Sequence, residues 1–117
     1  MNTGGQYDLS FLNKISDGDQ VFILDMIRTF KNTAPLSVRK MKNLLKEKKY
    51  ESLSREAHRI IPGISFLGVK YIEEDLMKIE DYSKKKENLD QLLSLISIVE
   101  DNINQLILQF NKDFNLT

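Results

Sequence analysis

The chain has 117 residues, and its 17 basic and 17 acidic side chains cancel, which argues against a protein that binds nucleic acid through a basic surface. The absence of cysteine excludes disulfides, thiolate metal sites and thiol catalysis, and one histidine is too few for a metal site built from several histidines of one chain. No apolar run approaches the roughly 18 residues of a membrane span and no signal peptide opens the chain, so we expect a cytoplasmic protein that is not bound to a membrane.

Apolar residues recur at every third or fourth position along most of the chain, which is typical of helices. We expect residues 1–6 to form a flexible lead-in and residues 7–117 to form a single helical domain. A short helix is predicted over about 8–15, with Leu9, Leu12 and Phe11 turned inward. After a turn at 16–19, a second helix is predicted over about 19–31. Its broad apolar face contains Phe22, Ile23, Met26, Ile27 and Phe30.

Prolines and glycines divide the rest of the chain. Asn32 and Thr33 are expected to end the second helix, and Pro35 to occupy the first turn of a third helix that runs to about residue 48. A fourth helix is predicted over about 50–67, and Gly68 ends it in a left-handed conformation. A fifth follows over about 69–85. The last is predicted over about 88–114, with a seam of Leu89, Leu92, Leu93, Ile96, Val99, Ile103, Leu106 and Phe110.

The connections between these segments are short, and short connections make consecutive helices antiparallel neighbours. The fold class that we expect is therefore all-α. Its architecture is an antiparallel up-and-down four-helix bundle with an additional short N-terminal helix, and the extra elements pack at one end.

The single histidine, His58, is predicted to face solvent. The apolar stripe of its helix repeats at spacings of four and three residues, and His58 lies about 140° from the centre of that stripe. Pro62, four residues later, cannot donate a hydrogen bond to the His58 carbonyl, so we expect the helix to kink or loosen there. Two alternatives stay open: a surface histidine with no task, and a helix that ends at Ile61 and resumes after Gly63.

A carboxylate is predicted to lie beside this histidine. If Gly68 is the corner of a helical hairpin, His58 and Glu80 both lie about 15 Å or slightly more from that corner. A carboxylate that accepts the Nδ1–H of an imidazole fixes its tautomer and leaves the Nε2 lone pair free, as a nucleophilic histidine requires. The alternative for Glu80 is an ordinary solvated or salt-bridged glutamate.

Residues 57–68, AHRIIPGISFLG, resemble the signature of histidine-containing phosphotransfer (HPt) domains. That signature has Ala-His, a basic residue shortly after the histidine, and glycine at the tenth following position; Ala57, His58, Arg59 and Gly68 match it. The chain departs from it at Ile61, where lysine is usual, and at Pro62, where glycine is usual. The resemblance extends from about residue 9 to residue 110.

The resemblance implies a phosphorelay intermediate and not an enzyme with its own nucleotide site. In such a relay His58 accepts a phosphoryl group from a receiver-domain aspartate and passes it to another receiver. Glu80 would orient the imidazole, and Arg59 and Lys84 would supply positive charge near the phosphoryl group. The residues expected to contact the partner are Ser54, Arg55, Ile61, Pro62 and Ser65.

The partners implied are response-regulator receiver domains and a sensor histidine kinase, either separate or within the same longer chain. No cofactor is expected in this chain, since the receiver would supply the Mg²⁺. Two other hypotheses stay open. One is a helical adaptor of the same shape that binds a protein partner without passing phosphate, which the change to Ile61 favours. The other is a structural bundle that oligomerises through an outer apolar stripe, with Ile98 and Ile107 as weak support.

Overall fold

The computed structural model describes residues 7–116, so the lead-in expected over residues 1–6 and the final residue of the expected domain lie outside the described residues. The described chain consists of α1 (Ser10–Ser16), α2 (Gln20–Lys46), α3 (Tyr50–Phe66), α4 (Lys70–Lys85), the 3₁₀ turn η1 (Leu89–Gln91) and α5 (Leu92–Asp113). The prediction of an all-helical chain is confirmed. None of the helices within residues 7–116 has the length and apolar character needed to cross a membrane.

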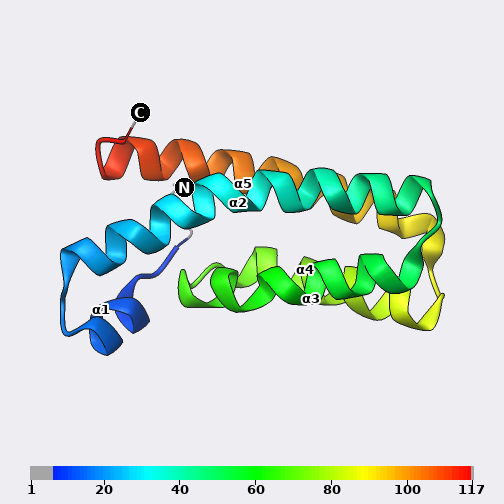
Figure 1. The fold of residues 1–117 in the computed structure, drawn as a ribbon, viewed down its shortest axis with the longest axis horizontal. Helices are drawn as coiled ribbons and strands as arrows, with labels where there is room; N and C mark the ends of the chain where they lie inside the picture. The colour runs from blue at the N-terminus through cyan, green and yellow to red at the C-terminus, as the bar shows by residue number, and fades with distance from the viewer. Residues whose placement is uncertain (1–6, 117) are drawn as a thin grey trace.

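The four long helices pack side by side. Figure 1 shows α2 and α5 in one layer and α3 and α4 in the other, with α1 at the end where α2 begins. Contacts join α2 to α3, α3 to α4, α4 to α5 and α5 back to α2, and those between α3 and α4 are the most extensive. The α3–α4 hairpin is therefore the pair of helices best placed to hold side chains from two elements in a fixed relationship.

The predicted break in the second helix is wrong. α2 continues from Gln20 to Lys46 with Pro35 inside it. The buried residues that flank Pro35, Ala34 and Val38, belong to one apolar face. This face is buried along the whole helix as Ile23, Ile27, Phe30, Ala34, Val38 and Met41. Because ending the helix at Asn32 would disrupt this continuous face, packing outweighs the one hydrogen bond that proline removes.

Three residues expected to face inward are instead exposed: Phe11 at 48%, Phe22 at 38% and Leu93 at 64%. Phe11 packs on the molecular surface, where its ring stacks on Phe66 with the centroids 5.5 Å apart. Leu93 lies about 100° around α5 from the buried Leu92, which turns it away from the core.

The last helix also begins later than predicted, because residues 89–91 form a 3₁₀ turn.

The hairpin that carries His58 forms as predicted. α3 runs through Pro62 without interruption, so the alternative of a helix that ends at Ile61 is wrong. Gly68 has φ +67°, the left-handed conformation expected at the corner. The Asp8 N–H donates to the Leu67 carbonyl at 2.9 Å, and a Cβ on Gly68 would lie only 2.5 Å from the Asp8 carbonyl oxygen. The corner thus requires glycine for its backbone angle and also for the space that the N-terminal segment occupies.

Candidate functional site

The α3–α4 hairpin places the histidine beside the predicted carboxylate. The Nδ1 atom of His58 lies 2.8 Å from Oε2 of Glu80, and their side chains are 71% and 28% exposed. With Nδ1 protonated, the imidazole donates to Glu80 and its Nε2 lone pair points away from this contact. The contact thus orients the imidazole on an open surface and leaves Nε2 outside the contact with Glu80.

Ser54 helps to place Glu80. Its hydroxyl donates to the backbone carbonyl of Glu80 at 2.9 Å, and Ser54 is only 6% exposed. Ser54 and His58 are four residues apart, so they lie on the same face of α3 on successive turns. The buried Ser54 therefore holds α4 against α3 at Glu80, whereas the sequence analysis expected it to contact a partner.

Most of the predicted site residues surround one open hollow of about 520 Å³ on the α3–α4 surface. The residues that line it are Glu51, Ser54, Arg55, His58, Arg59, Glu80 and Lys84. Lys84 is exposed and lies one helical turn beyond Glu80 on α4. The predicted partner contacts Ile61, Pro62 and Ser65 are not part of this lining; Ile61 is half-buried, and Pro62 and Ser65 are exposed.

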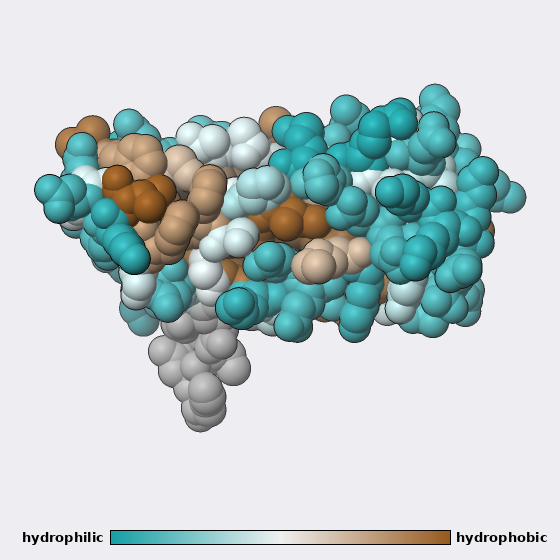
Figure 2. Space-filling model, turned by 90° about the horizontal axis from the view of Figure 1, so that it is seen from below, coloured by the Kyte–Doolittle hydropathy of each residue, from teal (hydrophilic) through white to brown (hydrophobic). Residues whose placement is uncertain are grey.

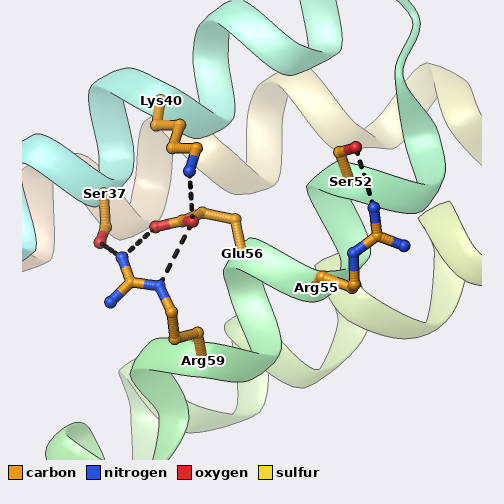
Figure 3. Close-up of polar contacts among 6 residues, drawn as sticks. All are labelled: Ser37, Lys40, Ser52, Arg55, Glu56 and Arg59. Atoms are coloured by element: carbon orange, nitrogen blue, oxygen red, sulfur yellow. Dashed lines mark hydrogen bonds and ion pairs between the residues drawn. The ribbon is translucent and has the colours of Figure 1, made fainter.

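The Arg59 guanidinium makes its hydrogen bonds with one residue of α3 and one residue of α2. Figure 3 shows that it reaches Glu56 on its own helix and Ser37 on α2. Nη2 donates to Glu56 Oε2 at 2.5 Å and to Ser37 Oγ at 2.9 Å, and Nε donates to Glu56 Oε1 at 3.4 Å. Lys40 of α2 lies 3.4 Å from Glu56 Oε1. The structure thus brings Arg59 to the wall of the hollow, while its charged group serves a contact between α2 and α3.

Glu56 is a buried carboxylate that the sequence analysis missed. It is 4% exposed. Burial by itself raises the pKa of its carboxyl, but hydrogen bonds from Arg59 and Ser37 and the charges of Arg59 and Lys40 outweigh burial and lower that pKa. The same contact with Glu56 raises the pKa of Arg59. The sequence did contain a signal, because Glu56 interrupts the apolar side of α3 and lies three residues before an arginine.

The Arg55 guanidinium lies apart from this cluster, as Figure 3 shows. It donates to Ser52 at 3.2 Å and lies 3.5 Å from Glu51 at the exposed start of α3. Weak, solvated contacts of this kind leave an arginine free to rearrange. Arg55 is thus the more accessible of the two arginines beside His58.

One group of exposed apolar residues lies at the end of the molecule that carries α1. Figure 2, seen from the α3–α4 side, shows apolar residues at the end that carries α1 and again in the middle of this face, and mainly hydrophilic residues at the opposite end. Exposed apolar residues of α1 are Phe11 and Ile15, at 48% and 52%. Phe11 stacks on Phe66 at the end of α3, so this apolar surface joins α1 to the helix that carries His58.

Within residues 7–116, no group of three or more histidine, aspartate and glutamate side chains is arranged to hold a metal ion. Comparison of the chain with family models, with curated proteins and with solved structures found no match.

Proposed function

We propose that the chain is a phosphocarrier in which His58 accepts a phosphoryl group from an aspartyl phosphate on a receiver domain and passes it to another receiver. In this proposal the four long helices form the antiparallel up-and-down bundle of an HPt domain, which works in the cytoplasm. The receiver supplies the Mg²⁺ and the acidic pocket. The chain supplies one oriented imidazole and no nucleotide site.

One observation carries this proposal: the 2.8 Å contact between Nδ1 of a 71% exposed histidine and a half-buried glutamate. An imidazole on a surface without such a contact can exchange its tautomers and rotate freely. An imidazole that donates its Nδ1–H to a carboxylate is fixed in orientation, and the Nε2 lone pair of the neutral ring is then aimed in one direction. Orientation of this kind is the main requirement of phosphoryl transfer, which depends on in-line geometry and on neutralising the equatorial oxygens.

In the transfer step, the Nε2 lone pair of His58 attacks the phosphorus atom of the aspartyl phosphate. The P–Nε2 bond forms as the P–O bond to the aspartate breaks, and the aspartate leaves as a carboxylate. Nδ1 keeps its proton, and Glu80 balances the positive charge that develops on the ring. The reverse step, onto the aspartate of a second receiver, uses the same geometry.

The hollow also contains a cation for the transferred group. Lys84 lies on its rim, one turn from Glu80, and is the best placed of the predicted cations because the Arg59 guanidinium contacts Glu56 and Ser37. Ile61 stands where the HPt signature usually has lysine, so we expect this site to hold the phosphoryl group with fewer charges than the signature would provide.

The test is phosphoryl transfer from a panel of phosphorylated receiver domains in the presence of Mg²⁺. We expect acid-labile label on the wild-type chain and none on His58→Gln, which keeps a polar side chain of similar size but has no nucleophilic nitrogen. Label on His58→Gln equal to that on the wild type would contradict the proposal. If the wild type binds receivers and never acquires label, the helical adaptor is the correct function.

A further inference from the structure

Arg59 directly follows the proposed phosphorylated residue, yet its guanidinium is held by another anion. It makes three hydrogen bonds, two to the buried Glu56 on its own helix and one to Ser37 on α2. The side chain as a whole is 62% exposed and also forms part of the wall of the hollow at His58. Arg59 therefore borders two anionic positions, the buried Glu56 and the phosphoryl group that His58 would carry.

The two positions compete unequally for the guanidinium. Glu56 is 4% exposed, so removing its main partner would leave a buried carboxylate without adequate compensation, which is among the more destabilising changes in a protein. Ser37 and Lys40 would remain, but Ser37 carries no charge, and the Lys40 ammonium is 3.4 Å away on a side chain that is 63% exposed. A phosphoryl group on the exposed His58 is solvated, and an exposed ion pair gains little. Glu56 should therefore keep Arg59 even after His58 is phosphorylated.

We propose that Glu56 is a positioning residue that withholds the Arg59 guanidinium from the phosphoryl group on His58 and so weakens the hold of the site on phosphate. This inference rests on the proposed phosphorylation of His58. A carrier must release its phosphoryl group as readily as it accepts it, and one cation fewer in the hollow favours release.

The test is the Glu56→Gln variant, which keeps the shape of the side chain and removes its charge. Wild type and variant are phosphorylated with phosphoramidate, whose P–N bond breaks with loss of ammonia as the P–Nε2 bond forms. The protonation of the phosphoryl group is then followed by ³¹P NMR as a function of pH. A guanidinium released toward the phosphoryl group stabilises its dianion, so we expect the titration midpoint to fall by about 0.2–0.7 pH unit in Glu56→Gln.

Two further variants separate positioning from a general effect on structure. Arg59→Gln alone should leave the midpoint at the wild-type value, because Arg59 does not contact the phosphoryl group while Glu56 is charged. The double variant Glu56→Gln with Arg59→Gln should also return to the wild-type value. A merely structural role for Glu56 would give the same midpoint in Glu56→Gln as in the wild type, which would overturn the inference.

A rise of the midpoint in Arg59→Gln would also overturn the inference, because it would show that Arg59 already contacts the phosphoryl group. Circular dichroism shows whether each variant is folded. If Glu56→Gln does not fold, the midpoint of Arg59→Gln decides between the inference and its alternative: a wild-type midpoint supports the inference, and a raised midpoint overturns it. Phosphoramidate needs no receiver domain, so the outcome is separate from the proposed function. A chain that no receiver labels can still show the shift in Glu56→Gln, in which case only the phosphorelay role fails.

Discussion

The hydroxyl of Ser54 donates a hydrogen bond to the backbone carbonyl of Glu80. His58, one turn further along α3, contacts the side chain of the same glutamate. Glu80 is therefore held by α3 at two points, through its backbone and through its carboxylate. The imidazole and its partner keep their relationship because two neighbouring turns of the same pair of helices fix it. The resulting pair, more than the histidine alone, is the chemically distinctive feature of the surface.

Replacing Glu80 tests the value of this orientation. We expect Glu80→Ala to slow phosphoryl transfer to His58 by about 10- to 100-fold, since a misplaced reacting group costs that order of rate. Glu80→Gln should lose less, because an amide oxygen can still accept the Nδ1–H. The measurement is the single-turnover rate of label transfer from a phosphorylated receiver. Asp81→Ala is the matched control, because Asp81 pairs with Lys85; equal rates for Glu80→Ala and this control would count against the role of Glu80.

Arg59→Gln should destabilise the fold by about 1–3 kcal/mol near neutral pH, because it leaves the buried Glu56 with a weaker set of partners. The native pKa of Glu56 is lowered from its ordinary value of 4.5, so the stability that this carboxylate contributes is complete above that value and is lost as the pH falls through the native pKa. The cost of the substitution should therefore shrink below about pH 4.5. Urea unfolding of both proteins as a function of pH measures it, and a cost that stays constant on acidification would refute the explanation.

Gly68 and Gly63 should respond to alanine in opposite directions. Gly68→Ala should cost at least about 2 kcal/mol, because it combines a left-handed residue with a Cβ only 2.5 Å from the Asp8 carbonyl oxygen. Gly63 lies inside α3, where an added Cβ would meet nothing within 4 Å, so Gly63→Ala should stabilise the protein by about 0.5–1 kcal/mol. Thermal unfolding of the two variants is the measurement. A loss of stability in Gly63→Ala would show that its surroundings are tighter than described.

Pro62→Ala should make the protein more stable by about 1–2 kcal/mol. Proline in the interior of α3 leaves the His58 carbonyl without its intrahelical donor, and alanine restores that hydrogen bond. The gain is partly offset because proline also restricts the unfolded chain. Urea unfolding measures the difference, and a variant no more stable than the wild type would mean that the helix is already adapted to the proline.

Tyr7 should make the protein sensitive to alkali. Burial, the hydrogen bond that its hydroxyl donates to Asp113 and the negative charge of Asp113 raise the pKa of Tyr7 to about 12. A raised native pKa gives stability that is complete below the ordinary value of 10.0 and is lost as the pH rises from there toward 12. Tyr7→Phe removes this contribution, so wild type and variant should converge in stability above about pH 10. Unfolding by urea at several alkaline pH values measures the difference, and a gap that persists would contradict this account.

The local sequence pattern was enough to predict the hairpin and the contact between His58 and Glu80. The positions of Leu53, Ala57 and Ile64 predicted which side of α3 is buried, and Gly68 marked the corner. Two helices that meet at a known corner have a nearly fixed register, so the pairing of His58 with Glu80 could be predicted from counting residues. The limits of α3 and α4 were also close to the predicted ones.

The predictions failed at positions where tertiary packing, and not the local sequence pattern, determines the structure. Pro35 indicated a helix start, but the apolar spacing from Phe30 through Ala34 to Val38 continues without a change of phase, and that continuity was the better signal. Contacts between segments distant in sequence, such as Tyr7 with Asp113, left no pattern that a single sequence reveals. The direction of the Arg59 guanidinium could not be predicted for the same reason, because it depends on Ser37 in another helix.

The corner at Gly68 lies between His58 and Glu80, so the number of residues separating them is part of the site. Inserting or deleting one residue in either helix between the corner and the pair would rotate one partner by about 100° relative to the other. Chain length between positions 58 and 80 should therefore be invariant. The connections at 47–49 and 86–91 lie outside this interval and can change length without disturbing the pair.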